Sequence, residues 1–222
     1  MKNKQGFSLI EILVALALVG LVYTIAITGQ SSPRASLDDV TEQIERYVRF
    51  ASDEAALRNT IMRLHFKLDE NPQTFFLEVG PESALAMPEE RVKDTSKMTK
   101  EEKEEYEKSV SDFNKNFSKL KDFEDSEQEV PDNIRIIGVS TSDLDYLTID
   151  SDAYIYIYPT GEKDNGLIIV SSDTEMIALE INPYTFEFNR SYHTMGPPNE
   201  EELEDRQIDL AKEIYANWPK AK

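Results

Sequence analysis

An uninterrupted apolar stretch near the N-terminus is the strongest pattern in the chain. It runs from residue 7 to residue 27, broken only by one glycine and by Ser8, Glu11 and Thr24. As a helix rising about 1.5 Å per residue, it can cross a hydrocarbon core of roughly 30 Å. Lys2 and Lys4 precede it without an acidic residue. This asymmetry predicts a cytoplasmic N-terminus, with the rest of the chain beyond the membrane.

A second pattern, with steps of three and four residues, follows between Ser36 and Ala56. The apolar positions are Leu37, Val40, Ile44, Tyr47, Val48, Ala51, Ala55 and Ala56. Such spacing predicts an amphipathic helix with one packed face. We expect Ser36 to cap this helix, and Pro33 to mark a break or bend between the apolar span and the amphipathic part.

Beyond residue 60 the period changes to two, which is typical of strands. Met62, Leu64, Phe66 and Leu68 alternate with Ile61, Arg63, His65 and Lys67. Asn71-Pro72 predicts a turn, and residues 74–79 a returning strand. Because His65 shares its face with Arg63 and Lys67, we expect its side chain to point into solvent.

Residues 82–132 interrupt the strands with a charged segment that is poor in apolar residues. Thr99 followed by Glu102 has the spacing of a capping box and predicts a helix from about residue 100. We interpret the segment as an acidic insertion. Its charge run is expected to be a solubilising surface, with a partner-docking arm as the alternative.

The C-terminal half predicts antiparallel hairpins followed by a last helix. The expected strands are 133–139, 146–149, 153–158, 167–170, 176–181 and 184–189. Tyrosines alternate with aliphatic residues in 153–158, which favours a sheet face that touches other structure over a cofactor site. After Gly196-Pro197-Pro198 an amphipathic helix is expected, with Asn199 as its N-cap and Trp218 packing back on the body.

Composition removes most enzyme classes. The chain has 222 residues, no cysteine, two histidines and a formal net charge of −19. Without cysteine, disulfides, thiol nucleophiles and thiolate metal sites are excluded. Two histidines leave little for a zinc site or a Ser-His-Asp triad. We therefore expect no catalytic activity and no cofactor.

Two binding hypotheses remain open at this stage. A net charge of −19 argues against a nucleic-acid partner, which needs clustered basic residues. The nearest basic group for DNA capture is Arg58, Arg63, His65 and Lys67. Calcium is a weak possibility, because one loop supplies candidate oxygen ligands at Asp143, Asp145, Asp150 and Asp152.

The start of the apolar stretch carries a family resemblance. Residues 6–16, Gly-Phe-Ser-Leu-Ile-Glu-Ile-Leu-Val-Ala-Leu, resemble the class III signal of type IV pilins and type II secretion pseudopilins. The resemblance implies cleavage by prepilin peptidase between Gly6 and Phe7, with N-methylation of Phe7. It also implies that Glu11 meets the N-terminal amine of a neighbouring subunit during assembly. A plain membrane anchor, or a secretory signal cut near Ala26, is the alternative.

The remainder resembles the H-type minor pseudopilins more loosely. Tyr158-Pro159-Thr160-Gly161 resembles a turn of that group, and residues 181–186 resemble its final hairpin, although Phe186 stands where a glycine often occurs. The resemblance implies a structural subunit at or near the tip of a periplasmic pseudopilus. A minor type IV pilin that primes assembly, or that binds DNA or another ligand, is the alternative.

The expected fold class is α+β, with a long N-terminal helix packed on an antiparallel sheet. The expected organisation is a leader at 1–6, a membrane and fibre-core helix at 7–28 and an amphipathic helix at 29–58. A globular domain at 59–195 and a helix or tail at 196–222 complete it. Implied partners are other pseudopilins, prepilin peptidase and an inner-membrane assembly platform, with the globular domain in the periplasm.

Overall fold

The computed structural model describes residues 9–28, 33–81, 98–121, 127–196 and 202–220, with the side chains of 21–28 and of Glu107 excepted. Its helices are α1 (Leu9–Thr28), α2 (Pro33–Arg58), α3 (Lys100–Asn114) and α4 (Leu203–Asn217). The strands before residue 130 are β1 (Met62–Lys67), β2 (Thr74–Val79), β3 (Ser118–Lys119) and β4 (Gln128–Glu129). Those after it are β5 (Arg135–Thr141), β6 (Asp152–Ile157), β7 (Gly166–Ser171), β8 (Glu175–Ile181) and β9 (Phe188–Thr194).

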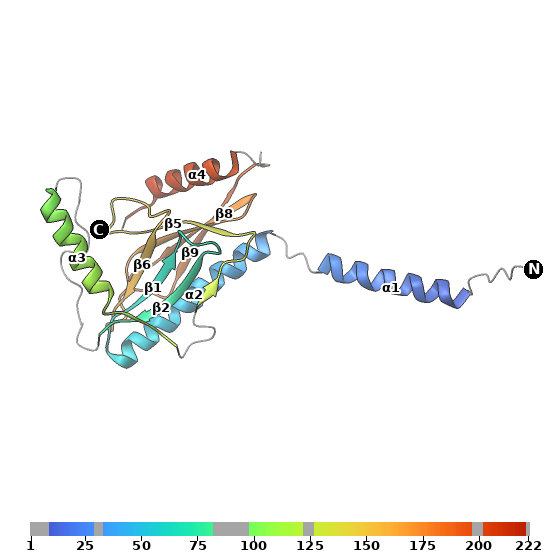
Figure 1. Cartoon of the computed structure of the whole chain (residues 1–222), viewed down its shortest axis with the longest axis horizontal. Helices are drawn as coiled ribbons and strands as arrows, with labels where there is room; N and C mark the ends of the chain where they lie inside the picture. The colour runs from blue at the N-terminus through green and yellow to red at the C-terminus, as the bar shows by residue number, and fades with distance from the viewer. Residues whose placement is uncertain (1–8, 29–32, 82–97, 122–126, 197–201, 221–222) are drawn as a thin grey trace, which may run out of the picture.

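The strands form two sheets in which every pair is antiparallel. Sheet A has the order β3-β2-β1-β6, with β4 also pairing with β2. Sheet B has the order β5-β7-β8-β9. In Figure 1, α1 extends away from the sheets, and α2 and α4 lie on different sides of them. The α+β class with an N-terminal helix and antiparallel sheets is thus confirmed.

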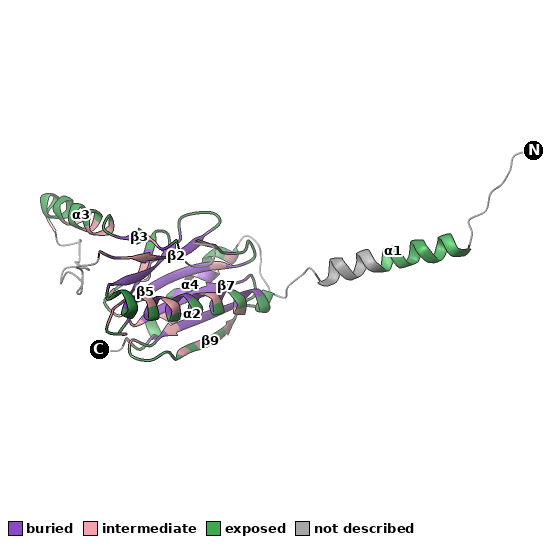
Figure 2. Ribbon diagram, turned by 90° about the horizontal axis from the view of Figure 1, so that it is seen from below, coloured by how far each residue is buried: buried purple, intermediate pink, exposed green. Residues whose placement is uncertain are grey.

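The main core lies between α2 and the inner faces of both sheets. Ala56 is exposed, against the expectation from its spacing, and Leu57 is 79% exposed. The other predicted apolar positions of α2, from Leu37 to Ala55, are fully or almost fully buried, as their spacing predicted. They pack against the even-numbered side chains of β1 and the odd-numbered ones of β6, together with residues of β2, β7 and β8. Figure 2 shows α2 lying along the buried strands, with its outer face exposed. Burial of this one face, at about 25 cal/mol per Å² of apolar surface, holds the helix on the sheets.

A second core covers the other face of sheet B. Leu167, Ile169, Met176 and Ala178 point away from α2 and are buried by α4, with Ala211 and Trp218 among the contacts. Trp218 is 7% exposed, so the expected packing of this residue on the body is confirmed. Gln207 of α4 is also buried, and its Nε2 donates to Ser171 Oγ and to Ser172 O at 3.1 Å each. Helix α4 is therefore fixed by both apolar and polar contacts.

Several sequence expectations about single elements are wrong. Ser36 does not cap the amphipathic helix, because α2 is already helical from Pro33, a residue whose fixed φ suits a first turn. Residues 146–149 form no strand and contribute one bridge, between Thr148 and Val139. The last strand begins at Phe188, because Asn182 Oδ1 accepts from the backbone N–H groups of Tyr184 and Thr185 and extends the turn.

The insertion contains more sheet than its composition suggests. The helix expected after Thr99 is confirmed as α3, and its capping box forms between Thr99 and Glu102 in both directions. Beyond α3, however, β3 and β4 add to the outer edge of β2. Lys119 forms an ion pair with Glu127 between these two short strands. The described parts of the insertion are therefore attached to sheet A through both β3 and β4.

Candidate functional site

The N-terminal segment holds the processing and assembly residues. Gly6 and Phe7 lie outside the described residues, whereas Glu11 lies in the first turn of α1 and is exposed. Large apolar residues of α1 are also exposed, among them Leu9 at 79% and Leu16 at 64%. Within the described ranges, no helix meets the length and hydropathy criteria for crossing a membrane.

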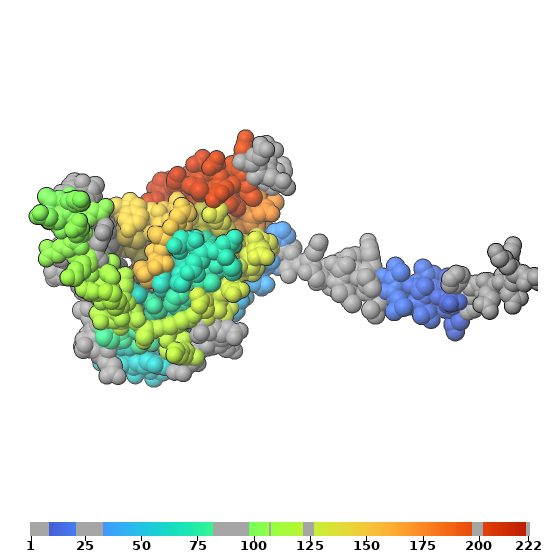
Figure 3. Space-filling model, viewed as in Figure 1, coloured from blue at the N-terminus to red at the C-terminus, as the bar shows by residue number. Residues whose placement is uncertain are grey.

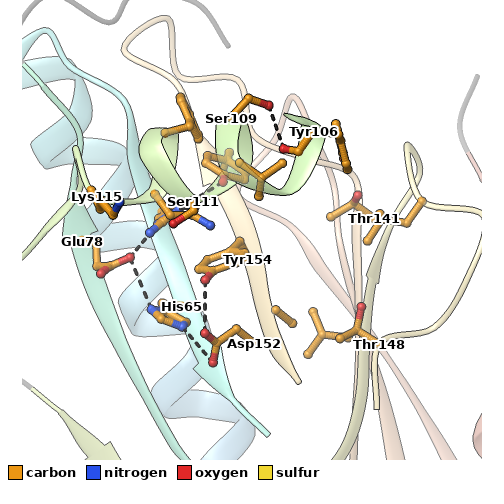
Figure 4. Close-up of a pocket in the computed structure, with 18 of the residues that line it drawn as sticks. His65, Glu78, Tyr106, Ser109, Ser111, Lys115, Thr141, Thr148, Asp152 and Tyr154 are labelled. Atoms are coloured by element: carbon orange, nitrogen blue, oxygen red, sulfur yellow. Dashed lines mark hydrogen bonds and ion pairs between the residues drawn. The ribbon is translucent and has the colours of Figure 1, made fainter. Parts of the chain in front are cut away.

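A cleft of about 1050 Å³ lies between α3, the outer face of sheet A and the segment after β5. Figure 4 shows its side chains, and Figure 3 shows α3 standing out from the body on the side away from α1. Outward-facing residues of β1, β2 and β6 lie under it, and the C-terminal half of α3 forms one wall. The opposite wall comprises Val139, Thr141, Leu144, Tyr146 and Thr148.

Strand register explains which side chains meet on this face of sheet A. Arg63 of β1 pairs with Glu78 of β2 on one side and with Tyr156 of β6 on the other. His65 lies opposite Phe76 and Tyr154 in the next row. Since alternate residues of a strand share a face, these rows lie side by side on the face turned away from α2.

Arg63 anchors the end of α3 to the sheet. Its side chain is 2% exposed, and its Nε donates to Glu78 Oε2 at 2.6 Å. Its Nη1 donates to Asn114 Oδ1 at 2.5 Å and to the Tyr156 hydroxyl at 3.2 Å. The guanidinium carbon lies 4.0 Å and 4.2 Å from the ring centroids of Phe117 and Tyr154. Arg63 therefore joins α3, β2 and β6 through one buried charge.

His65 is buried, and the expectation that it points into solvent is wrong. Its side chain is 9% exposed, with Nδ1 3.3 Å from Glu78 Oε2 and Nε2 3.4 Å from Asp152 Oδ1. The rings of Phe76 and Tyr154 lie 4.6 Å and 4.5 Å from it, centroid to centroid. The alternation of β1 was interpreted correctly, but β1 is flanked on both sides by strands with large aromatic residues, which cover its outer face.

Charges and burial set the protonation of the surrounding groups. Burial raises the pKa of Glu78, but the contacts with His65 and Arg63 outweigh it, so that the pKa lies below its ordinary value. Burial, with a contribution from Asp152, raises the pKa of Tyr154. Burial, with a contribution from Tyr106, also raises the pKa of Tyr146. At neutral pH the cleft therefore contains an ionised Glu78 beside protonated Tyr146 and Tyr154.

Asp152 is the most exposed carboxylate of the cleft. Its side chain is 48% exposed, and its Oδ2 accepts from the Tyr154 hydroxyl at 3.4 Å. The side chain of Glu78, by contrast, is only 12% exposed and already forms an ion pair with Arg63. Tyr106 of α3 and the 57% exposed Tyr146 also line the cleft, from its two opposite walls.

The calcium hypothesis finds no support in the geometry. Across the residues that the structure describes, which include Asp143, Asp145, Asp150 and Asp152, no three or more acidic or histidine side chains converge as a metal would require. Asp152 lies in β6 beside His65, and Asp150 belongs to a different hollow with residues 68–73 and 130–135. The four carboxylates are therefore split between sites.

The basic group proposed for DNA capture is also dispersed. Arg63 and His65 are buried, Arg58 forms an ion pair with Glu54 at 2.6 Å, and Lys67 pairs with Glu70 at 2.8 Å. Because each charge is engaged by an acidic neighbour, the four residues make no exposed basic surface.

The cleft itself was not expected from the sequence. An arginine inside an alternating strand, and the tyrosine ladder of 153–158, were the available signals for a covered outer face.

Comparison with known proteins identifies a sequence motif at the N-terminus. Residues 1–27 match the family model described as "Prokaryotic N-terminal methylation motif". No curated protein sequence gives a significant match. Two solved structures of the minor pseudopilin EpsH from the Type 2 Secretion System of Vibrio cholerae are similar. One shows 9% identity, a TM-score of 0.39 and coverage of 74% of this chain and 99% of that one.

The second EpsH structure shows 7% identity and a TM-score of 0.40, with 76% of this chain and 99% of that chain covered. Likeness at this level does not decide which subclass the chain represents. The motif match confirms the resemblance noted for residues 6–16. The chain therefore has a type IV pilin-like N-terminus followed by an α+β domain.

Proposed function

We propose that the chain is a minor pseudopilin of the H type, a structural subunit at or near the tip of the periplasmic pseudopilus of a type II secretion system. Prepilin peptidase cleaves it between Gly6 and Phe7 and methylates Phe7. The observation that carries the proposal is the methylation motif over residues 1–27, joined to an apolar helix and a sheet-packed second helix. The function is mechanical, without a catalysed reaction.

The exposed apolar residues of α1 support a fibre-core role. Ile10, Leu13 and Leu16 are 70%, 59% and 64% exposed. Such side chains are stable in lipid before assembly and against the helices of neighbouring subunits after it. Exchange of lipid contacts for protein contacts lets one helix serve as membrane anchor and as fibre core. In this proposal the N-terminus lies in the cytoplasm and the globular domain in the periplasm before assembly, an orientation that Lys2 and Lys4 before the apolar span favour.

Glu11 sets the axial stagger between subunits in this proposal. A carboxylate within an apolar span costs about 2.5–3.5 kcal/mol at a helix centre, and less near the membrane surface where Glu11 lies. The N-terminal amine that cleavage creates at Phe7 is a charge of opposite sign. Pairing of Glu11 with that amine on a neighbour lowers the cost of both charges in a medium of low dielectric constant.

A minor type IV pilin that primes pilus assembly is the second candidate, because the methylation motif is common to both systems. DNA capture by such a pilin is disfavoured by the net charge of −19 and by the engagement of Arg58, Arg63 and Lys67 in ion pairs. The partners proposed in either case are other pilin-like subunits, prepilin peptidase and the assembly platform.

The first experiment is the intact mass and N-terminal sequence of the membrane-extracted chain, with a Gly6→Ala variant. We expect a mature chain that begins at methylated Phe7, and an unprocessed chain in the variant. Gly20→Ala is the matched control, because a methyl group at Gly20 meets nothing within 4 Å and processing should be unchanged. A cut near Ala26, or an unprocessed wild-type chain, would contradict the proposal.

Cysteine cross-linking tests assembly. The chain contains no cysteine, so that Leu16→Cys introduces a unique thiol on the exposed face of α1. We expect it to cross-link to a matching cysteine in the core helix of a major pseudopilin, and the cross-link to disappear with Glu11→Val. Deletion of the gene should leave exported proteins in the periplasm. Loss of surface pili with export intact would favour the pilus system instead.

A further inference from the structure

We infer that the cleft between α3 and the outer face of sheet A binds an arginine-bearing peptide segment of a partner protein. This inference goes beyond the structural role proposed above and does not depend on N-terminal processing. It concerns the volume of about 1050 Å³ that α3, β6 and the segment after β5 enclose. Figure 4 shows Asp152 and Tyr154 inside this volume and Tyr106 at its edge.

The charges around the cleft favour a positively charged ligand. The Arg63 guanidinium is engaged by Glu78, and Lys115, the lysine of this lining, pairs with Asp112 at 2.9 Å. The carboxylate that remains most accessible is Asp152, 48% exposed, within a chain of net charge −19. Because the local carboxylate and the field of the whole protein have the same sign, the cleft attracts a cation.

Aromatic rings determine the kind of cation. Arg63 already lies 4.0 Å from Phe117 and 4.2 Å from Tyr154, which shows that rings on this face accept a guanidinium. Beside the exposed carboxylate, the ring that the structure provides is that of Tyr154, whose hydroxyl donates to Asp152 Oδ2 at 3.4 Å. Tyr106 and Tyr146 add further rings elsewhere on the lining. A planar guanidinium can stack on a ring while it donates two hydrogen bonds to one carboxylate, whereas an ammonium cannot do both as well.

The size and the remaining side chains indicate a peptide. The volume exceeds that of one side chain and lies near the upper end for small-ligand sites, about 300–1,000 Å³. Leu144, Val110 and Phe113 provide apolar surface, and the Thr141 and Thr148 hydroxyls can bond to a peptide backbone. An arginine with one apolar neighbour on each side therefore fits the lining.

Calorimetric titration of the full chain in zwitterionic micelles tests the inference. The probes are acetyl-Leu-Arg-Leu-amide, its lysine analogue and its citrulline analogue, which keeps the shape of arginine without the charge. We expect saturable binding of the arginine peptide with a dissociation constant of about 1 mM or lower. The lysine peptide should bind more weakly, and the citrulline peptide at least about tenfold more weakly. Equal affinities, or no binding of the arginine peptide, would overturn the inference.

Variants with matched controls locate the binding site. Asp152→Asn should weaken arginine-peptide binding at least about tenfold, because it removes the accessible charge without changing the side-chain shape. Asp150→Asn is the control, an exposed acidic residue on the same segment that lies outside the cleft. Tyr146→Ala should weaken binding, whereas Tyr184→Ala, which alters a 77% exposed tyrosine elsewhere, should not. Equal effects of a variant and its control would exclude the cleft.

Aromatic and hydroxyl side chains also suit a carbohydrate. A separate titration with chitotetraose therefore tests whether the cleft binds a sugar instead of a peptide. We expect no saturable binding of this sugar. Sugar binding that Asp152→Asn abolishes, together with failure of the arginine peptide, would replace the inference with a carbohydrate site. Because processed and unprocessed chains should bind the peptide equally, failure here leaves the proposed pseudopilin role untouched.

Discussion

Arg63 Nε donates to Glu78 Oε2 at 2.6 Å across β1 and β2, and the Arg63 guanidinium lies 4.0 Å from the ring centroid of Phe117, which follows α3. The pair is completed by further hydrogen bonds, since Nη1 of Arg63 donates to Asn114 and Tyr156. A buried ion pair that is completed in this way specifies how the insertion attaches to the sheet.

Loss of Arg63 should be strongly destabilising. Arg63→Ala leaves the ionised Glu78, 12% exposed, without its main partner, and we expect unfolding to become easier by about 3–5 kcal/mol. Arg58→Ala is the control, because its ion pair with Glu54 is 41% exposed on the arginine side and should contribute under about 1 kcal/mol. Urea denaturation measures both, and equal midpoints for the two variants would contradict the buried-pair account.

Acid should weaken the fold partly through Glu78. Its folded-state pKa is depressed, so that its stabilising contribution is complete above the unfolded value of 4.5 and is lost as pH falls through the folded value. Glu78→Gln should therefore lower stability at pH 7 and show a shallower loss as the pH falls below 4.5. Denaturation curves across this range provide the measurement. The exposed Glu129→Gln should retain the wild-type pH profile.

The capping box of α3 gives a local prediction. Thr99 Oγ1 accepts from the N–H of Glu102, and Glu102 accepts from the N–H of Thr99 at 2.8 Å. Thr99→Ala should destabilise α3 by about 1 kcal/mol and lower hydrogen-exchange protection there, without changing sheet B. Glu102→Gln keeps a capping box and should keep most of the protection. Equal losses of protection in both variants would argue against the capping-box explanation.

Gly80 should tolerate no side chain. A methyl group there would lie 2.9 Å from Ile61 O, a backbone atom, and 3.1 Å from the Phe117 ring. We expect Gly80→Ala to cost about 1–3 kcal/mol of stability through displacement of the strand ends. Thermal unfolding is the measurement, with Gly20→Ala as the comparison, since nothing lies within 4 Å of its added methyl group. A lower Tm in Gly20→Ala would show that α1 contacts the rest of the protein.

Sequence pattern predicted the elements whose signal lies within a short stretch of chain. The three-four spacing of α2, the alternation of β1 and the cap at Thr99 are each decided by neighbours along the chain, and each is confirmed. The burial of His65 could not be predicted in this way. It depends on Phe76 of the neighbouring strand β2 and on Tyr154, which β6 brings beside it from a distant part of the sequence.

The strands β3 and β4 escaped prediction for a related reason. Each pairs only two residues with β2, too few for a period to be visible within a charged segment. The shift of the last strand to Phe188 follows from hydrogen bonds of the Asn182 side chain, which extend a turn by a few residues. The cleft depends on how α3 lies over the sheet, which is set by Arg63 and Asn114.

The covering of sheet B by α4 has a consequence for biogenesis. Leu167, Ile169 and Met176 face α4, which follows every strand in chain order. In the topology proposed above, the strands of sheet B present a bare apolar surface until α4 has also crossed the membrane. The domain would then complete its folding only once α4 has been translocated. Until that point it is exposed to aggregation, so we expect periplasmic chaperones to have their greatest influence during that interval.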